Sequence, residues 1–119
     1  MQCGSQLAEH RIVHRRWAAA LAVLLAAGGA AAADADMEAG RRLFTSGATP
    51  SCAICHALKD AEAAGAVGPV LDELKPDAAR VVAALKTGIG AMPSYQATLS
   101  EAQMQALGRY VTRATGAAK

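Results

Sequence analysis

Two cysteines and a histidine stand close together in the run Cys52-Ala53-Ile54-Cys55-His56. Residues at i and i+3 lie on one face of a helical turn, so both thiols could reach the two vinyl groups along one haem edge and form thioethers. The histidine that follows could place a neutral imidazole nitrogen against the iron. This spacing is the c-type haem attachment pattern. It predicts one haem c, fastened through Cys52 and Cys55, with His56 as an iron ligand.

The same cysteine spacing also occurs in zinc sites and redox disulfides, and the rest of the chain disfavours both. A structural zinc site needs four ligands, but the only other cysteine and histidines are Cys3, His10 and His14, near the start of the chain. A thioredoxin-like pair is expected in a βαβ context. No segment shows the period-2 alternation that predicts such strands. Haem attachment is therefore the preferred interpretation.

The sixth iron ligand is expected to be a methionine, because His56 is the only histidine after residue 33. Met37 and Met104 fall on predicted helix faces, where core packing explains them. Met92 stands in a loop between Gly90 and Pro93, with no helical periodicity to account for it. A His/Met pair raises the reduction potential and suits electron transfer, whereas an open iron position suits gas binding or peroxide chemistry. The sequence favours Met92 as ligand, with a five-coordinate site as the alternative.

Helices are expected to position these residues, and the predicted fold class is all-α. Three main helices and one short helix are predicted around the haem, with essentially no sheet. The first has Asp36 as N-cap, and the last begins at a capping box, Ser100-Glu101-Ala102-Gln103. The predicted ranges are Met37–Thr45, a short attachment helix Cys52–Leu58, a helix after Pro76 that stops at Gly88, and a helix from Ser100, with loops at 59–74 and 88–99.

The first third of the chain is typical of an export signal. His14, Arg15 and Arg16 end a positive region, an apolar run of eleven residues spans Trp17–Ala27, and small residues follow. Cleavage is predicted after residue 33, with residue 35 as the second option, leaving a domain of residues 34–119. An uncleaved anchor is the alternative, but a span needs about 20 apolar residues. No stable membrane insertion is therefore expected after cleavage.

Charge in the remaining domain is balanced, because nine of the twelve Lys and Arg residues and nine of the ten acids follow residue 33. No basic stripe remains, so nucleic acid is not expected as a partner. The domain is also small enough to be marginal on its own. Small domains usually need a staple, and a large apolar macrocycle would supply one.

The domain of residues 34–119 resembles, along nearly its whole length, the small bacterial class I cytochromes c, monohaem proteins with His/Met ligation. Gly40 and Phe44 are similar to that family's N-terminal helix signature, and Leu107 and Tyr110 to its C-terminal one. The resemblance implies that these two helices cross closely, with the glycine allowing the contact. It also extends to the segment Ala91-Met92-Pro93, which is similar to the one that carries the axial methionine.

The loop Gly68-Pro69-Val70-Leu71 is similar to the family's Gly-Pro-Asn-Leu loop. Its spacing could bring a carbonyl to His56, and a ligating histidine normally donates its other ring N–H to such an acceptor. The resemblance implies that Pro69 supplies this carbonyl. Val70 departs from the family's polar residue, so no hydrogen bond is expected from that side chain.

These residues predict a periplasmic electron carrier rather than an enzyme, since no acid–base or nucleophile–base pair accompanies the motif. Its expected partners are periplasmic redox proteins: a dehydrogenase or respiratory complex as donor, and an oxidase or another cytochrome as acceptor. One alternative is a permanent electron-transfer subunit of a periplasmic dehydrogenase. A narrower resemblance of residues 71–95 points to cytochromes that serve sulfite dehydrogenases. A second alternative is an open-site haem enzyme or gas sensor.

Overall fold

The structure is a computed structural model that describes residues 29–118. The chain divides into two compact units, Met1–Asp34 and Ala35–Lys119. In the first unit the described residues, 29–34, are helical. The predicted export signal lies mainly outside the described residues, so it stays a prediction. No helix among residues 29–118 is both long enough and apolar enough to cross a membrane.

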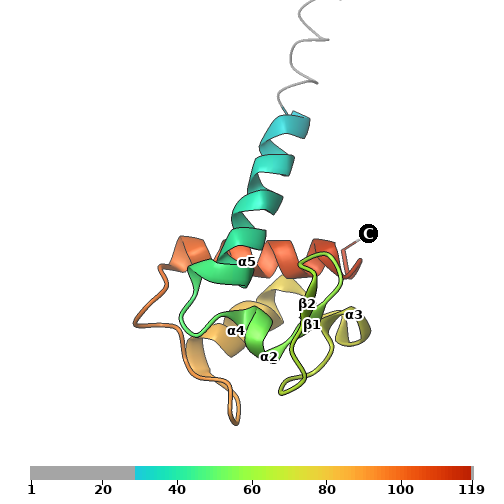
Figure 1. The fold of residues 1–119 in the computed structure, drawn as a ribbon. Coiled ribbons are helices and arrows are strands. Elements are labelled where there is room, and N and C mark those ends of the chain that lie inside the picture. Colours follow the sequence, from blue (N-terminus) through green and yellow to red (C-terminus); the bar gives the residue numbers. More distant parts are fainter. Residues whose placement is uncertain (1–28, 119) are drawn as a thin grey trace, which may run out of the picture. The chain divides into compact units, whose positions relative to one another are not determined.

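The second unit is built mainly of helices, which confirms the predicted all-α class (Figure 1). It begins with α-helical residues 35–42, which continue directly into a π-helix, η1. The remaining helices and strands follow it along the chain. The bounds are η1 Leu43–Gly47, α2 Cys52–Cys55, β1 Ala57–Leu58, β2 Ala63–Ala64, α3 Leu71–Leu74, α4 Ala78–Thr87 and α5 Glu101–Ala114.

The first helical segment crosses α5 at a glycine, as the resemblance implied (Figure 1). A Cβ on Gly40 would collide with Cβ of Tyr110 and would lie 3.1 Å from the carbonyl oxygen of Ala106. The close approach lets the rings of Phe44 and Tyr110 meet at a centroid distance of 6.0 Å, tilted by 57°, in the range of favourable aromatic pairs. Both side chains are fully buried. This crossing forms one side of the core.

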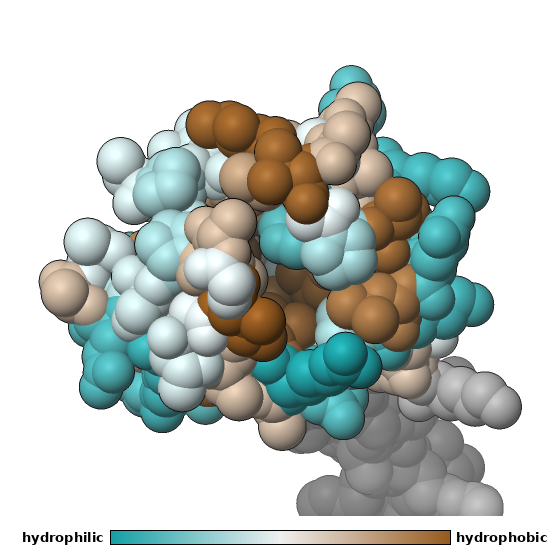
Figure 2. Space-filling model, turned by 90° about the horizontal axis from the view of Figure 1, so that it is seen from below, coloured by the Kyte–Doolittle hydropathy of each residue, from teal (hydrophilic) through white to brown (hydrophobic). Residues whose placement is uncertain are grey.

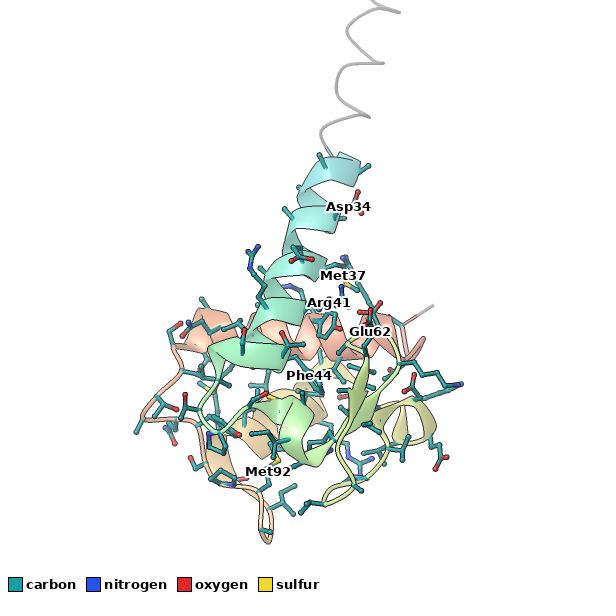
Figure 3. The ribbon with its side chains drawn as sticks, viewed as in Figure 1. Asp34, Met37, Arg41, Phe44, Glu62 and Met92 are labelled. Carbon is teal, nitrogen blue, oxygen red and sulfur yellow. The ribbon has the colours of Figure 1, made fainter. Side chains whose placement is uncertain are left out.

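Long-range polar contacts fasten this first segment to the rest of the unit. Arg109 on α5 donates two hydrogen bonds to the carboxylate of Asp36, at 2.7 and 2.8 Å. One helical turn after Met37, Arg41 donates to Glu62 at 3.2 Å (Figure 3). The prediction that Asp36 caps this helix is wrong, because helical residues precede it from residue 29. The Asp36 carboxylate instead accepts hydrogen bonds from Arg109, far along the chain.

Helix α4 begins and ends where local signals indicated, and α5 begins where its capping box indicated. Asp77 is the N-cap of α4 and its side chain accepts a hydrogen bond from the backbone N–H of Arg80 at 2.7 Å. The predicted capping box of α5 is present, with reciprocal bonds between Ser100 and Gln103 of 2.9 and 3.2 Å. Gly88 ends α4 with φ of 69°, a conformation that costs a glycine little. These two helices are packed against each other.

The region between the motif and α4 differs from the prediction. The attachment helix was expected to reach Leu58, but α2 stops at Cys55 because His56 is extended (φ −110°, ψ 135°). Residues Ala57–Leu58 then pair antiparallel with Ala63–Ala64, so a small sheet replaces the expected absence of strands. The end of the predicted loop also contains the short helix α3, which Lys75 ends with φ of 46°.

Candidate haem site

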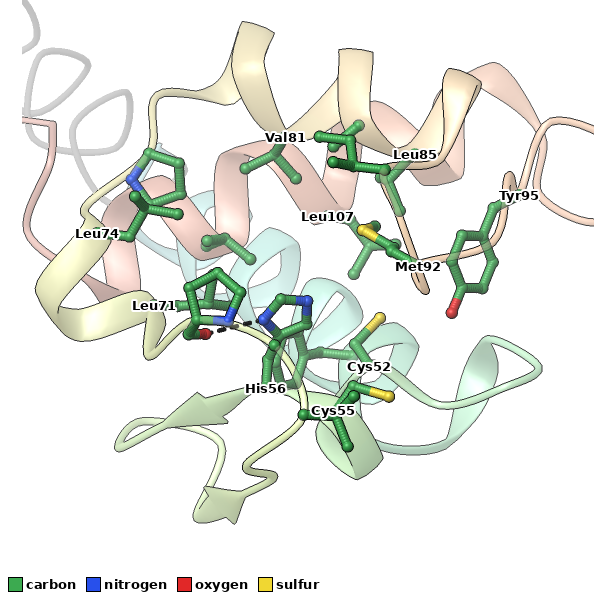
Figure 4. A pocket seen from close by; sticks show the side chains of 18 of the residues that line it. Cys52, Cys55, His56, Leu71, Leu74, Val81, Leu85, Met92, Tyr95 and Leu107 are labelled. Atoms are coloured by element: carbon green, nitrogen blue, oxygen red, sulfur yellow. Dashed lines mark hydrogen bonds between the residues drawn. The ribbon is translucent and has the colours of Figure 1, made fainter.

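The attachment motif begins at α2, which is fastened to η1 by the residue before it. Ser51 does not cap α2 with its side chain. Its hydroxyl donates instead to the carbonyl oxygens of Phe44 and Thr45, at 3.1 and 2.7 Å. The single helical turn then places Cys52 and Cys55 on the same side (Figure 4). Both thiols are free and partly buried, as attachment to an external group requires.

A largely apolar pocket of about 400 Å³ lies beside the motif. Its walls come from α2, from the 67–71 loop, from α4 and the 88–95 segment, and from two residues of α5. The space-filling view shows it as a hollow bordered mostly by hydrophobic residues (Figure 2). Cofactor pockets commonly have volumes of about 300–1,000 Å³ and apolar walls. The size and lining of the pocket therefore suit a flat apolar macrocycle.

His56 is oriented by the loop that follows it. Its Nδ1 lies 2.9 Å from the carbonyl oxygen of Pro69 (Figure 4). Because a carbonyl can only accept, Nδ1 carries the proton and Nε2 keeps its lone pair. Gly68 packs against the ring face: a Cβ there would lie 2.5 Å from Cε1 and 2.8 Å from Nδ1. The histidine thus has the tautomer and the fixed ring position that a metal-ligating imidazole needs.

Met92 lies on the opposite wall of the pocket, in the loop after α4 (Figure 4). Reciprocal backbone bonds with Ile89, of 2.9 and 3.1 Å, close a tight turn around it. Gly88 allows this turn, because its φ is 69° and a Cβ there would lie 2.7 Å from the Met92 carbonyl oxygen. Met92 is partly buried. The predicted axial residues are therefore brought to one cavity from two separate segments.

Tyr95 joins these two segments, a role the sequence did not reveal. Its hydroxyl donates to the carbonyl oxygen of Pro50 at 2.8 Å, two residues before the motif. Its backbone N–H donates to the carbonyl oxygen of Leu85 at 2.7 Å. Burial raises the pKa of the Tyr95 hydroxyl, which favours its neutral, donating form. The only sequence signal was a single aromatic residue in the predicted loop 88–99.

The thiol of Cys52 is held in its neutral form. Burial raises its pKa to about 11, with the neighbouring Cys55 thiol adding to the effect. A neutral thiol is expected in an apolar wall, since burial disfavours the thiolate. Thioether formation would remove this titration altogether. Among residues 29–118 no group of three or more His, Cys, Asp or Glu side chains gathers to hold a metal ion.

A helical domain whose apolar pocket is bordered by this motif has the features of a c-type cytochrome. Residues 35–111 match the family described as "Cytochrome C oxidase, cbb3-type, subunit III", and the chain belongs to this family of c-type cytochromes. The matched stretch begins where the second unit begins. Members of the class bind haem covalently, and the pocket, the paired thiols and the imidazole fit that group. No curated protein matches the chain.

The chain is also similar to a solved structure, the c-type cytochrome SorU from Sinorhizobium meliloti. The two share 46% sequence identity, over 70% of this chain and 94% of that chain, with a TM-score of 0.66. This likeness supports the same class and the same small cytochrome fold.

Proposed function

We propose that this chain is an exported electron carrier that holds one haem c through Cys52 and Cys55, with His56 and Met92 as axial ligands. It would pass single electrons in the periplasm from a dehydrogenase or respiratory complex to a downstream acceptor. The observation that carries the proposal is that both thiols, the imidazole and the methionine border one apolar cavity. Bound haem supplies a one-electron iron couple.

The residues of the pocket suit electron transfer without bond making. The Pro69 carbonyl keeps the Nδ1 proton on His56, so Nε2 can stay a ligand in both redox states. The turn around Met92 limits movement of its sulfur. Apolar walls keep water away from the centre. Because both ligands are fixed before the electron arrives, little has to reorganise when the charge changes.

Exposed apolar side chains gather near the pocket and support brief docking to redox partners. Ile54 lies between the two cysteines, and Val67 and Ile89 line the pocket, with exposed fractions of 65%, 72% and 66%. Exposed apolar residues on the border of a cofactor pocket are suited to contact with a partner protein. Small interfaces of this kind are typical of weak electron-transfer complexes.

Export is the second part of the proposal and rests on residues 1–33 of the sequence. Cleavage after residue 33 or residue 35 would leave Asp36, and so its pairing with Arg109, in the secreted protein. Mass spectrometry of protein matured in a host that ligates haem tests both parts. One haem mass on a chain that starts at residue 34 or 36 is expected. A chain without porphyrin mass contradicts the proposal.

The axial methionine is tested by Met92→Ala, with Met37→Ala as control because Met37 lies in the first helical segment and does not line the pocket. Loss of the weak sulfur-to-iron absorption band is expected for Met92→Ala alone, together with new carbon monoxide binding to the reduced protein. If the wild-type protein binds carbon monoxide rapidly and completely at neutral pH, the iron has an open position. The gas-sensor or haem-enzyme alternative would then be favoured.

A permanent subunit of a periplasmic dehydrogenase, including a sulfite dehydrogenase, is the second candidate, and the same exposed apolar residues favour it. Gel filtration of a native periplasmic extract in moderate salt distinguishes the two. Elution of the haem absorbance at the size of the free chain supports a diffusible carrier. Co-elution with a dehydrogenase supports the subunit.

A further inference from the structure

Arg80 contributes the only arginine to a pocket lining that, among the described residues, contains no lysine, aspartate or glutamate. It lies in the first turn of α4, beside Val81 and one turn before Ala84, which also line the pocket. Its side chain is exposed, so it borders the cavity at the surface. Nothing in the sequence separates Arg80 from the other surface cations, and only the structure places it in the pocket lining.

No carboxylate of residues 29–118 forms an ion pair with the Arg80 guanidinium. The ion pairs in this part of the chain use other cations, and those pairs are Arg41–Glu62, Arg42–Glu38, Lys86–Glu101 and Arg109–Asp36. The nearest carboxylate in sequence, Asp77, accepts a hydrogen bond from the backbone N–H of Arg80 rather than from its side chain. Within this part of the chain, the Arg80 guanidinium therefore has no carboxylate partner.

The haem bound in the proposed way would bring two carboxylates into this pocket. The propionates of a haem project from the edge opposite the one that carries the vinyl groups. Cys52 and Cys55 lie on one side of His56, and Leu74 lies on the other side (Figure 4). Leu74 and Pro76, which lead into α4, line the pocket together with Arg80. A macrocycle fastened at the thiols would thus direct its propionates towards the start of α4.

We infer that Arg80 binds a haem propionate and thereby raises the reduction potential of the bound haem. The inference rests on the proposed haem attachment. A guanidinium suits this role because it donates in a fork that matches a carboxylate. Reduction adds one negative charge to the bound group, so a nearby cation stabilises the reduced state more than the oxidised state. Arg80 is thus a residue that binds the cofactor and sets its potential, and not an iron ligand.

The test compares midpoint potentials of the haem-loaded full chain at one pH and ionic strength. Arg80→Gln removes the charge and is expected to lower the equilibrium constant for reduction about three- to tenfold, where tenfold corresponds to about 59 mV for one electron. Arg80→Lys keeps a cation and should recover most of the loss. Arg113→Gln is the matched control, because Arg113 on α5 is exposed and does not line the pocket.

Equal potentials for Arg80→Gln and Arg113→Gln would overturn the inference. A crystal structure of the wild-type holoprotein gives a second test that needs no variant. A guanidinium nitrogen within about 3.2 Å of a propionate oxygen supports the inference, and one beyond hydrogen-bonding distance of both propionates overturns it. The thioethers hold haem whatever Arg80 does, so haem mass and the sulfur-to-iron band should persist in every variant. Their loss in the wild-type protein would instead refute the proposed function.

Discussion

Replacing Gly68 by alanine should displace the imidazole of His56 while leaving the backbone of the loop unstrained. A Cβ at this position would lie 2.5 Å from Cε1, 2.8 Å from Nδ1 and 3.0 Å from Nε2 of the ring. Real Cβ atoms do not approach other atoms so closely, and the ring is held in place by Pro69. The φ of Gly68 lies outside the left-handed region. The effect of the added methyl group is therefore steric.

The size of the effect follows from three contributions. Forcing an extra methyl group into a packed site costs about 1–3 kcal/mol. Weakening the hydrogen bond from Nδ1 to the Pro69 carbonyl costs about 0.5–1.5 kcal/mol. Alanine leaves the unfolded chain with less conformational freedom than glycine does, which offsets about 0.4–1 kcal/mol of this loss of stability. The free energy of unfolding of Gly68→Ala should thus fall by about 2 kcal/mol, which lowers the urea midpoint by about 1 M at an m-value near 2 kcal/mol/M.

The assay is urea unfolding of the haem-loaded protein, followed by haem absorbance and combined with the midpoint potential. The potential should rise, since a weaker hydrogen bond at Nδ1 makes His56 a less basic ligand. Gly116→Ala is the control, because its φ is 69°, no atom lies within 4 Å of its Cβ position and it does not line the pocket. It should cost about 1–2 kcal/mol of backbone strain without moving the potential. A Gly68→Ala protein with wild-type stability and potential would refute the reasoning.

Two further predictions concern the first helical segment. Gly40→Ala should lower the free energy of unfolding by about 1–3 kcal/mol in the same urea assay, because the new Cβ meets Tyr110 and the backbone of α5; an unchanged midpoint would contradict the close crossing. Asp36→Asn should lower the free energy of unfolding by about 0.2–1 kcal/mol at pH 7, which is typical of an exposed ion pair. Arg109 lowers the pKa of Asp36, so this stabilisation is present above pH about 4, the unfolded value, and is lost as pH falls through the folded pKa. Unfolding curves of variant and wild type should therefore converge in acid, and a constant difference across pH would exclude the ion pair as its source.

The parts of the fold that could be predicted are those with local causes. Helices α4 and α5 have their N-terminal caps within three residues of their starts, at Asp77 and at Ser100 with Gln103. The start of the first helix could not be predicted in this way. Asp36 had the type and place of an N-cap, but its carboxylate binds Arg109, 73 residues away in the sequence. A side chain with a distant partner gives no local signal of that partner.

The region after the motif was mispredicted for a similar reason. Residues 52–58 have ordinary helix-compatible composition, so nothing local ends the helix at Cys55. The structure ends it through contacts with the next segment: the backbone N–H groups of Val67 and Gly68 both donate to the Cys55 carbonyl oxygen, at 3.1 and 2.8 Å. A Cβ on Gly65 would lie 2.5–2.7 Å from the backbone of Cys55 and His56. This close packing turns the chain at His56.

The candidate site was more predictable than the fold around it, because its chemistry is concentrated in Cys52, Cys55 and His56. The contact between His56 and Pro69 could be inferred from a loop that resembles a known one. The places of Arg80 and Tyr95 in the pocket lining could not be inferred, because neither residue type nor spacing gives a local signal of them. Arg80 has the appearance of any surface cation on a helix, and only the packing of α4 brings it to the pocket.

The two walls of the pocket are organised separately, which leads to a last prediction. The wall of His56 is fixed by bonds to its own neighbour Cys55 and by Pro69. The wall of Met92 depends on α4 and is joined to the motif by the hydroxyl of Tyr95, which donates to Pro50. Tyr95→Phe removes that hydrogen bond, worth about 0.5–1.5 kcal/mol, and leaves the ring in place.

In Tyr95→Phe, Met92 is expected to be more mobile, while the position of His56 is expected to stay unchanged. Carbon monoxide should bind the reduced variant several-fold more readily than the wild type, because the Met92 wall opens more often. In Gly68→Ala, by contrast, the expected change in reduction potential arises at His56 and not at Met92. If Tyr95→Phe bound carbon monoxide no better than wild type, the Met92 turn would be rigid by itself. The hydrogen bond to Pro50 would then add only stability, and the bonds between Ile89 and Met92 would be what holds the sulfur in the pocket.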